Sequence, residues 1–285
     1  MKMFKDFFVL CRPHQWYKNV LVFLALFFSG NLFNLNLLTI SVYAFLILIL
    51  ISSGNYIIND IIDIKRDRQS PEKRKRPIAS GRIKIWQALI FACILIFLAL
   101  FFSLKINIDF FYSVAALFLA TLAYSLLLKK IFIVDIATVS ANFVTRAIAG
   151  ALAISVFVSP WLIVGIFLFA FFLVAGKRYG EILLLGKNAK KQRDVLKFYS
   201  RKMLKMIFYL FAVLLLICFA LFSYLEHRRL ILNSLLFACL VARYAQLANE
   251  KPLIAANPER AFSDNLLLVG SIIFIITSTL LLYVK

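Results

Sequence analysis

Three aspartates stand at helical spacing directly after an apolar stretch. Asp60, Asp63 and Asp67 are three and four residues apart in NDIIDIKRD, so one face of a helix would carry all three carboxylates. Three like charges on one face repel one another, and a divalent cation reverses that interaction. Mg²⁺ is commonly held by one or two carboxylates together with phosphate oxygens of a substrate. The pattern predicts a magnesium site, with Asn59 as an orienting or auxiliary ligand.

A dense group of basic residues follows the aspartates. Lys73, Arg74 and Arg76 are candidate phosphate ligands, and Pro71 and Pro77 should stop the helix, so the basic stretch is expected to form a loop that folds over a ligand. Carboxylates that hold a metal, next to cations that neutralise phosphate, are typical of a magnesium–diphosphate site.

The alternative is a solvated helix end, in which the acids pair with Lys65, Arg66 and Arg68 of the same segment. Charges at the end of an apolar span are costly and usually functional, which favours the ligand site.

The apolar runs around this cluster predict an integral membrane protein. The 285 residues are 63% hydrophobic and 16% charged, whereas a soluble domain carries about 25% charged residues. Runs near 20 residues can cross a hydrocarbon core of about 30 Å, and backbone groups in lipid must be satisfied internally, so the spans are helices. We expect one all-α domain, residues 1–285, a polytopic bundle of about nine transmembrane helices. The expected spans are 17–34, 37–59, 86–104, 108–128, 131–154, 157–176, 204–225, 229–248 and 265–284.

Basic residues gather on one side of this bundle. With the N-terminus in the cytoplasm, 28 of the 33 lysines and arginines fall on the cytoplasmic side. This bias predicts a multi-pass protein of the inner (cytoplasmic) membrane whose aspartates face the cytoplasm. The charge is expected to meet anionic membrane lipids rather than nucleic acid. The four cysteines form no CxxC pair, so neither a disulfide framework nor a zinc site is predicted.

The fifth predicted span carries polar residues on one face. At 100° per residue, Asn142 and Arg146 each lie within about 20° of Asp135 around the helix. A buried structural pair is one explanation, but Asp135 and Arg146 would be about 16 Å apart along the axis. The spacing therefore favours the lining of a polar cavity, because such groups normally face a bundle interior or a water-filled pocket.

Taken together, the motifs resemble the UbiA superfamily of intramembrane prenyltransferases. NDIIDIKRD is similar to the first aspartate-rich motif of that family. Five further segments resemble its decaprenyl-phosphate phosphoribosyltransferase branch: RPHQWYKN (12–19), KRKRPIASG (73–81), YSLLLKKIFIVD (124–135), RAIAGA (146–151) and AGKRYGE (175–181).

The resemblance implies a cytoplasm-facing polar cavity that binds 5-phosphoribosyl 1-diphosphate, a polyprenyl phosphate and Mg²⁺, and releases diphosphate. Further residues become substrate-binding candidates through their motifs alone. They are Lys18, Asn19, Tyr124, Lys129, Lys177, Arg178 and Glu181. Without the resemblance, lysines at a membrane edge would be taken as anchors, and Lys177 with Glu181 as an ordinary ion pair.

Two other functions stay open. A UbiA-type enzyme that moves a prenyl group from its diphosphate to an aromatic or other small acceptor would share the first motif, but its second motif is commonly DxxxD, and here Asp135 stands alone. A non-catalytic lipid-phosphate carrier would explain the basic face without requiring three aligned carboxylates. The sequence allows an oligomer but does not specify one.

Overall fold

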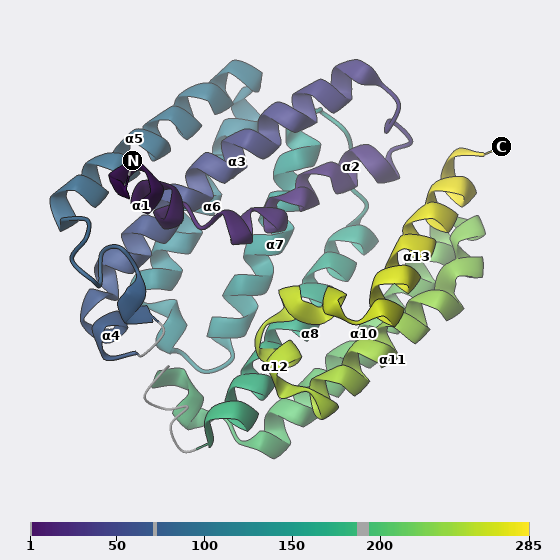
Figure 1. Ribbon diagram of the computed structural model, residues 1–285. Helices are drawn as coiled ribbons and strands as arrows, with labels where there is room; N and C mark the ends of the chain where they lie inside the picture. The colour runs from purple at the N-terminus through teal and green to yellow at the C-terminus, as the bar shows by residue number, and fades with distance from the viewer. Residues whose placement is uncertain (1, 71–72, 187–193, 285) are drawn as a thin grey trace. The chain divides into compact units, whose positions relative to one another are not determined.

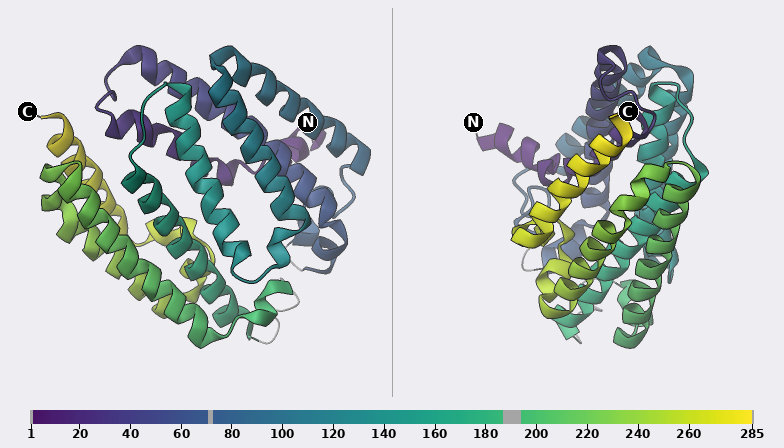
Figure 2. Two further views of the ribbon diagram at one scale, coloured as in Figure 1. Left: turned by 180° about the vertical axis from the view of Figure 1, so that it is seen from behind. Right: turned by 90° about the vertical axis from the view of Figure 1, so that its right-hand side faces the viewer.

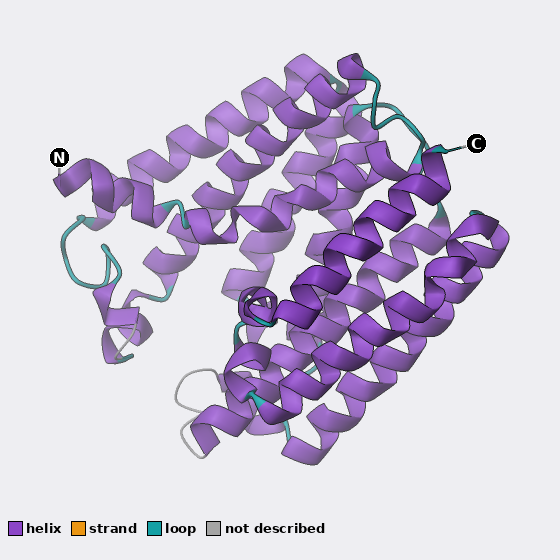
Figure 3. Ribbon diagram, turned by 45° about the vertical axis from the view of Figure 1, so that its right-hand side comes forward, coloured by secondary structure: helices purple, strands orange, loops and turns teal. Residues whose placement is uncertain are grey.

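The computed structural model describes residues 2–70, 73–186 and 194–284, and within them the elements are helices and loops, with no strand (Figure 3). Backbone contacts divide the chain into two compact units. Unit 1 comprises residues 1–129 and 142–158, and unit 2 comprises residues 130–141 and 159–285.

Eight described helical segments have the length and apolar composition of a membrane span. They are Leu35–Ile62 (α3), Ile85–Ile106 (α5), Ile108–Leu126 (α6), Val134–Ala153 (α7), Pro160–Leu185 (α8), Arg201–Leu225 (α10), Arg228–Glu250 (η6 and α11) and Asn265–Tyr283 (α13). The prediction of an all-α, multi-pass membrane protein is confirmed, and eight of the nine expected spans are present.

The expected first span differs from the other eight. Residues Pro13–Val22 form a 3₁₀-helix (η1), and only Phe23–Phe28 continue as an α-helix (α2). A 3₁₀-helix rises about 2.0 Å per residue, so the combined run is about 29 Å long, close to the thickness of a hydrocarbon core. Sixteen residues are too few for the α-helical span that was expected at 17–34. A ninth membrane crossing therefore stays a prediction.

Unit 1 is built around α3, which runs beside α5 (Figure 1) and packs against α5, α6 and η1. Its apolar core joins Val22 of η1, Leu48 and Ile51 of α3, and Phe110 of α6, all fully buried. At 28 residues, α3 is about 42 Å long, so its last turns extend beyond a hydrocarbon core. That length carries the aspartate motif to the edge of the span.

Short elements surround this end of α3. They are α1 (Lys2–Leu10), α4 (Ile64–Gln69), the single 3₁₀ turn η2 (Lys73–Lys75), and η3 (Leu128–Lys130), which follows α6. Phe7 of α1 packs edge-on against Phe91 of α5, with ring centroids 5.0 Å apart. Leu10 of α1, Ile57 of α3 and Ile78, which follows the basic stretch, share one buried cluster, so the N-terminal segment and the basic loop pack against the same helix end.

Unit 2 pairs α8 with α10, and its later helices α11 and α13 lie alongside each other (Figure 2). Stacked rings join the first pair, because Phe171 and Phe211 have centroids 3.7 Å apart, and Phe172 and Phe208 lie 4.6 Å apart. The remaining elements of the unit are η5 (Asp194–Phe198), α11 (Ser234–Glu250), α12 (Pro252–Ala256) and η7 (Pro258–Ser263).

Helix α7 approaches η1 closely at Gly150. A Cβ atom there would lie 2.0 Å from the carbonyl oxygen of Val22, whereas one at Gly165 of α8 would meet only the Cys218 sulfur at 3.8 Å. We expect Gly150→Ala to destabilise the protein by about 1–3 kcal/mol through overpacking. Gly165→Ala should leave stability unchanged or higher, because alanine favours a helix. Thermal unfolding of both purified variants tests this, and equal midpoints would contradict the packing.

Candidate active site

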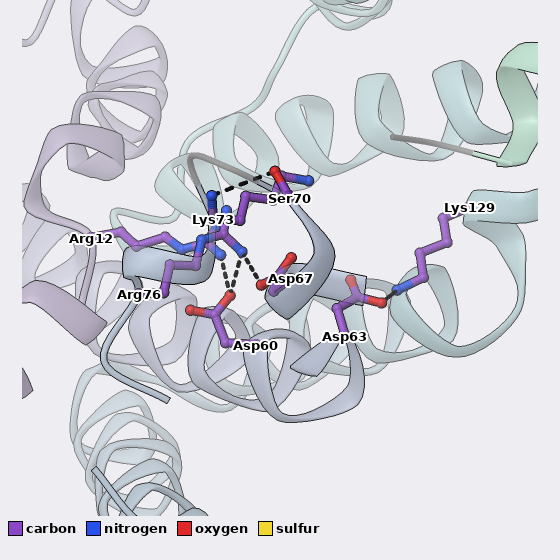
Figure 4. Close-up of polar contacts among 8 residues, drawn as sticks. All are labelled: Arg12, Asp60, Asp63, Asp67, Ser70, Lys73, Arg76 and Lys129. Atoms are coloured by element: carbon purple, nitrogen blue, oxygen red, sulfur yellow. Dashed lines mark hydrogen bonds and ion pairs between the residues drawn. The ribbon is translucent and has the colours of Figure 1, made fainter. Parts of the chain in front are cut away.

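Two of the three predicted aspartates share a cation. Asp60 and Asp67 are 4% and 2% exposed, and the Arg76 Nη1 atom donates to Asp60 Oδ1 at 3.0 Å and to Asp67 Oδ2 at 2.6 Å (Figure 4). Arg12 Nη2 also donates to Asp60 Oδ1. The buried carboxylates are thus neutralised by arginines from the N-terminal segment and from the basic loop.

Asp63 faces a different partner. Helix α3 ends at Ile62 and α4 begins at Ile64, and the intervening Asp63 accepts from Lys129 Nζ at 2.6 Å (Figure 4). Lys129 engages this carboxylate apart from the other two, although the backbone bonds from Asp63 N to Asn59 O and from Asp67 N to Asp63 O continue the helical pattern. A metal site that uses all three aspartates stays a prediction. The pairing does unite two sequence candidates, Asp63 and Lys129.

The alternative of a solvated helix end does not describe these acids. The partners described for them are Arg12, Arg76 and Lys129. Arg68 of the same segment donates instead to the Ala79 carbonyl at 3.2 Å. Burial raises the pKa of the Asp67 carboxyl above its ordinary value, while the charges of Arg76 and Lys73 act in the opposite direction. The Arg76 charge thus favours the ionised form of Asp67 against the effect of burial on its pKa.

The donor set suits a divalent metal in part. In the described portion of the chain no three acidic, histidine or cysteine side chains converge as ligands. Yet the oxygens of Asp60 and Asp67 converge on one guanidinium nitrogen, which occupies the position that a shared cation would take. Mg²⁺ is often bound by one or two carboxylates, with water and substrate phosphate completing its shell. Asp60 and Asp67 fit that role.

Arg12 is a site residue that the sequence reasoning missed. Its backbone is left-handed, at φ 50° and ψ 62°, a conformation that costs about 1–3 kcal/mol for a residue other than glycine. Its guanidinium lies over the Tyr56 ring, 5.1 Å from the centroid, while it bonds Asp60. The strain persists because the ion pair and the ring contact hold the residue in place. Arg12 is the first residue of the segment RPHQWYKN, and that motif is the sequence feature that could have identified it as a site residue.

The other predicted basic residues lie close by in the chain. Lys73 and Arg74 belong to η2, where the Lys73 amide bonds the Ser70 hydroxyl at 3.5 Å and Arg74 is exposed. Pro71 lies outside the described residues. The basic loop does return to the aspartates, but through Arg76.

Arg146 lies three turns inside α7 and is 7% exposed. Its Nε donates to Asn19 Oδ1 at 3.0 Å, and its Nη1 donates to the Asn142 carbonyl at 2.7 Å. Asn19 Oδ1 also accepts from the Ser52 hydroxyl at 3.3 Å. With the described residues Arg146 forms no ion pair, although a central arginine costs about 2.5–3.5 kcal/mol on insertion scales. The structure therefore brings together the candidates Asn19, Asn142 and Arg146 in unit 1.

Asp135 belongs to a separate network in unit 2. Arg178 Nε donates to Asp135 Oδ2 at 2.8 Å and its Nη1 reaches Glu181 Oε2 at 3.2 Å. The Tyr199 hydroxyl donates to Asp135 Oδ1 at 2.6 Å and accepts from the Ile133 amide at 2.8 Å. Asp135 is fully buried, so this network satisfies both of its carboxylate oxygens.

Three residues that were predicted to bind substrate therefore lie together, and their described partners are other side chains of the protein. Asp135, Arg178 and Glu181 interact with one another, with Lys177 half-buried on the same helix. Tyr199 carried no sequence signal, since nothing in the polar stretch around it marks a partner 64 residues away. Burial and the Asp135 carboxylate raise the pKa of the Tyr199 hydroxyl well above its ordinary value, so it stays a donor. A single cavity lined by Asp135, Asn142 and Arg146 stays a prediction.

The last three candidates are half-buried in unit 1. Asn59 precedes Asp60 on α3, Lys18 lies on η1, and Tyr124 lies near the end of α6.

The fold and the paired aspartates define a multi-pass helical membrane protein with a buried carboxylate–arginine site at the end of a span. The chain belongs to the UbiA prenyltransferase family, whose model matches residues 19–269. It is a membrane transferase, as the resemblance implied.

Two named relatives and one solved structure are similar to this chain. A decaprenyl-phosphate phosphoribosyltransferase of Mycolicibacterium smegmatis is 34% identical over 221 residues, covering 76% of this chain and 70% of its own. The Mycobacterium tuberculosis protein of the same name is 32% identical, covering 75% and 72%. A UbiA homolog from Archaeoglobus fulgidus, solved with GPP and Mg²⁺, superposes with a TM-score of 0.71 at 18% identity, covering 98% of this chain and 100% of its own.

The unit 2 network generates a stability prediction. Tyr199→Phe removes one hydroxyl and leaves Asp135 Oδ1 and the Ile133 amide without that partner, at an expected loss of about 1–3 kcal/mol. Tyr209→Phe is the matched control, because its hydroxyl meets Asn249 at an exposed site and should cost less than about 0.5 kcal/mol. Denaturant or thermal unfolding compares the two. A smaller loss of stability for Tyr199→Phe than for Tyr209→Phe would show that the network does not stabilise the protein.

Proposed function

We propose that this protein transfers 5-phosphoribose from 5-phosphoribosyl 1-diphosphate to a polyprenyl phosphate and releases diphosphate, in a magnesium-dependent reaction. The observation that carries the proposal is the sharing of Arg76 by two buried carboxylates at the end of a membrane span. Such a site suits a metal-bound diphosphate. The names of the two mycobacterial relatives support this donor and acceptor.

In this proposal Asp60 and Asp67 hold Mg²⁺, and Asp63 supports them from the next turn. A Mg²⁺ ion held there would supply Lewis-acid stabilisation of the negative charge on the diphosphate leaving group. Arg76 and Arg12, once released from the carboxylates, bind the diphosphate oxygens, for which a planar guanidinium is well suited. Lys73 and Arg74 add positive charge from the same loop.

The chemical step needs little from the protein beyond positioning and charge. An oxygen of the acceptor phosphate forms a bond to C1 of the ribose, and the C1–oxygen bond to diphosphate breaks. The electron pair leaves with the diphosphate, and no proton moves. The acceptor is already an anion, so no general base is required, which agrees with a site made of aspartates, arginines and lysines.

The site is proposed to open toward the cytoplasm of an inner membrane, because 28 of the 33 basic residues lie on that side in the predicted topology. The lipid tail of the acceptor would then remain among the helices while its phosphate reaches the polar groups. Lys18, Lys129 and Lys177 are the candidate lysines for that phosphate.

A second candidate function is prenyl transfer from a prenyl diphosphate to a small acceptor. The Archaeoglobus fulgidus protein, which shares the fold, was solved with GPP and Mg²⁺. In this chain, however, Asp135 is the single aspartate in the corresponding second segment, and it is engaged by Arg178 and Tyr199.

Asp60→Asn, Asp63→Asn and Asp67→Asn keep side-chain size and remove a charge, and each should lower turnover by about 100-fold or more. Asp109→Asn is the matched control, since Asp109 is exposed in the first turn of α6 and should retain activity. The assay uses membranes, Mg²⁺, labelled 5-phosphoribosyl 1-diphosphate and a polyprenyl phosphate, and counts label extracted into organic solvent. Near-normal rates for Asp60→Asn and Asp67→Asn would exclude the proposed metal site. Wild type that instead transfers a prenyl group to an aromatic acid would establish the second candidate.

A further inference from the structure

Among the residues that the structure describes, Arg146 has no anionic partner. It is 7% exposed inside α7, and its acceptors are the Asn19 side chain and the Asn142 carbonyl, both neutral. The Nη2 atom forms no hydrogen bond with any described residue. Every other strongly buried charge discussed above has an opposite charge in contact. A buried guanidinium with an unused donor is suited to an anion that the protein itself does not supply.

The groups around Arg146 form a polar site. Asn19 Oδ1 joins Arg146 to the Ser52 hydroxyl, so η1, α3 and α7 each contribute a side chain. Asn142, one turn before Arg146 and 7% exposed, has a buried Oδ1 atom with no hydrogen-bond partner among the described residues. An unsatisfied acceptor beside an unused donor matches a ligand that carries both a hydroxyl and a phosphate.

Ser52 of this site lies on the same side of α3 as Asp60. Ser52, Tyr56 and Asp60 follow one another at intervals of four residues, each one turn apart. Ser52 contacts the Arg146 group, Tyr56 lies under Arg12, and Asp60 bonds Arg12 and Arg76. The rise from Ser52 to Asp60 is about 12 Å. A molecule with phosphate at both ends would therefore have a separate cation for each end.

We propose that Arg146, with Asn19, Ser52 and Asn142, forms a subsite for a phosphate monoester, distinct from the metal–diphosphate site at Asp60 and Asp67. This inference rests on the proposed function, in which both substrates carry such a group: the 5-phosphate of the sugar donor and the head of the polyprenyl phosphate. The subsite also sets specificity, because a prenyl diphosphate would place hydrocarbon against the buried guanidinium.

Arg146→Lys keeps the charge and loses the planar fork, and Asn142→Asp gives Arg146 an internal anion one turn away. The second change separates the possible roles of Arg146. If the arginine is structural, the new ion pair preserves or raises stability and leaves ligand binding unaltered. If it binds phosphate, the carboxylate occupies it and repels the ligand.

The experiment measures equilibrium binding of three probes to purified protein in lipid nanodiscs: ribose 5-phosphate, a ten-carbon prenyl phosphate, and inorganic diphosphate with Mg²⁺. Both variants should bind one monoester about tenfold or more weakly and bind diphosphate as wild type does. Arg243→Lys is the matched control, because that membrane arginine is paired with Asp264 at 2.7 Å and should change no affinity.

A loss confined to ribose 5-phosphate assigns the subsite to the sugar donor, and a loss confined to the prenyl phosphate assigns it to the lipid acceptor. Unchanged binding of both monoesters in folded Asn142→Asp protein overturns the subsite, even if wild type forms product normally. Loss of monoester binding in the variants, together with absent lipid-linked product in wild type, leaves the subsite standing and rejects the proposed reaction.

Discussion

Two carboxylates buried at the end of a membrane span must be compensated by positive charge, and much of unit 1 is organised by that requirement. Removing a carboxylate from water is costly unless it is paired and hydrogen-bonded. Asp60 and Asp67 meet this condition by sharing the Arg76 guanidinium, and Asp60 also takes Arg12. These ion pairs draw the basic loop and the N-terminal segment onto the end of α3. The local strain at Arg12 follows from the same demand.

The same two acids explain how the site would respond to ligands. A guanidinium and a divalent metal are alternative partners for one pair of oxygens, so metal binding at Asp60 and Asp67 would free arginines for phosphate. Arg146 on α7 shows the reverse imbalance, because it is a buried cation with no anion among the described residues. Ser52, which joins the Arg146 group through Asn19, lies about 12 Å from Asp60 along α3. Metal and phosphorylated substrates together would satisfy both ends. In unit 2, by contrast, Asp135, Arg178 and Tyr199 satisfy one another within the protein.

Local sequence patterns predicted the features that depend on neighbouring residues. Apolar runs predicted nine spans, of which eight match described helices, and spacing predicted that Asp60 and Asp67 lie on one face, where the structure has them share Arg76. Features that depend on packing between distant segments were missed. Arg12 contacts Asp60, which lies 48 positions away in the chain, and Lys129 contacts Asp63, which lies 66 positions away. The first span was predicted as an α-helix because periodicity does not distinguish the 3₁₀ geometry that begins at Pro13.

The exchange of Arg76 for metal is the central claim, and the Mn²⁺ affinity of substrate-free protein tests it most directly. Electron paramagnetic resonance of free Mn²⁺ would compare wild type with Arg76→Gln, and with Arg74→Gln as a control for the loss of one nearby charge. If Arg76 competes with metal for Asp60 and Asp67, Arg76→Gln binds Mn²⁺ more tightly than both wild type and the control. Equal or weaker Mn²⁺ binding by Arg76→Gln than by Arg74→Gln would contradict the shared-cation site.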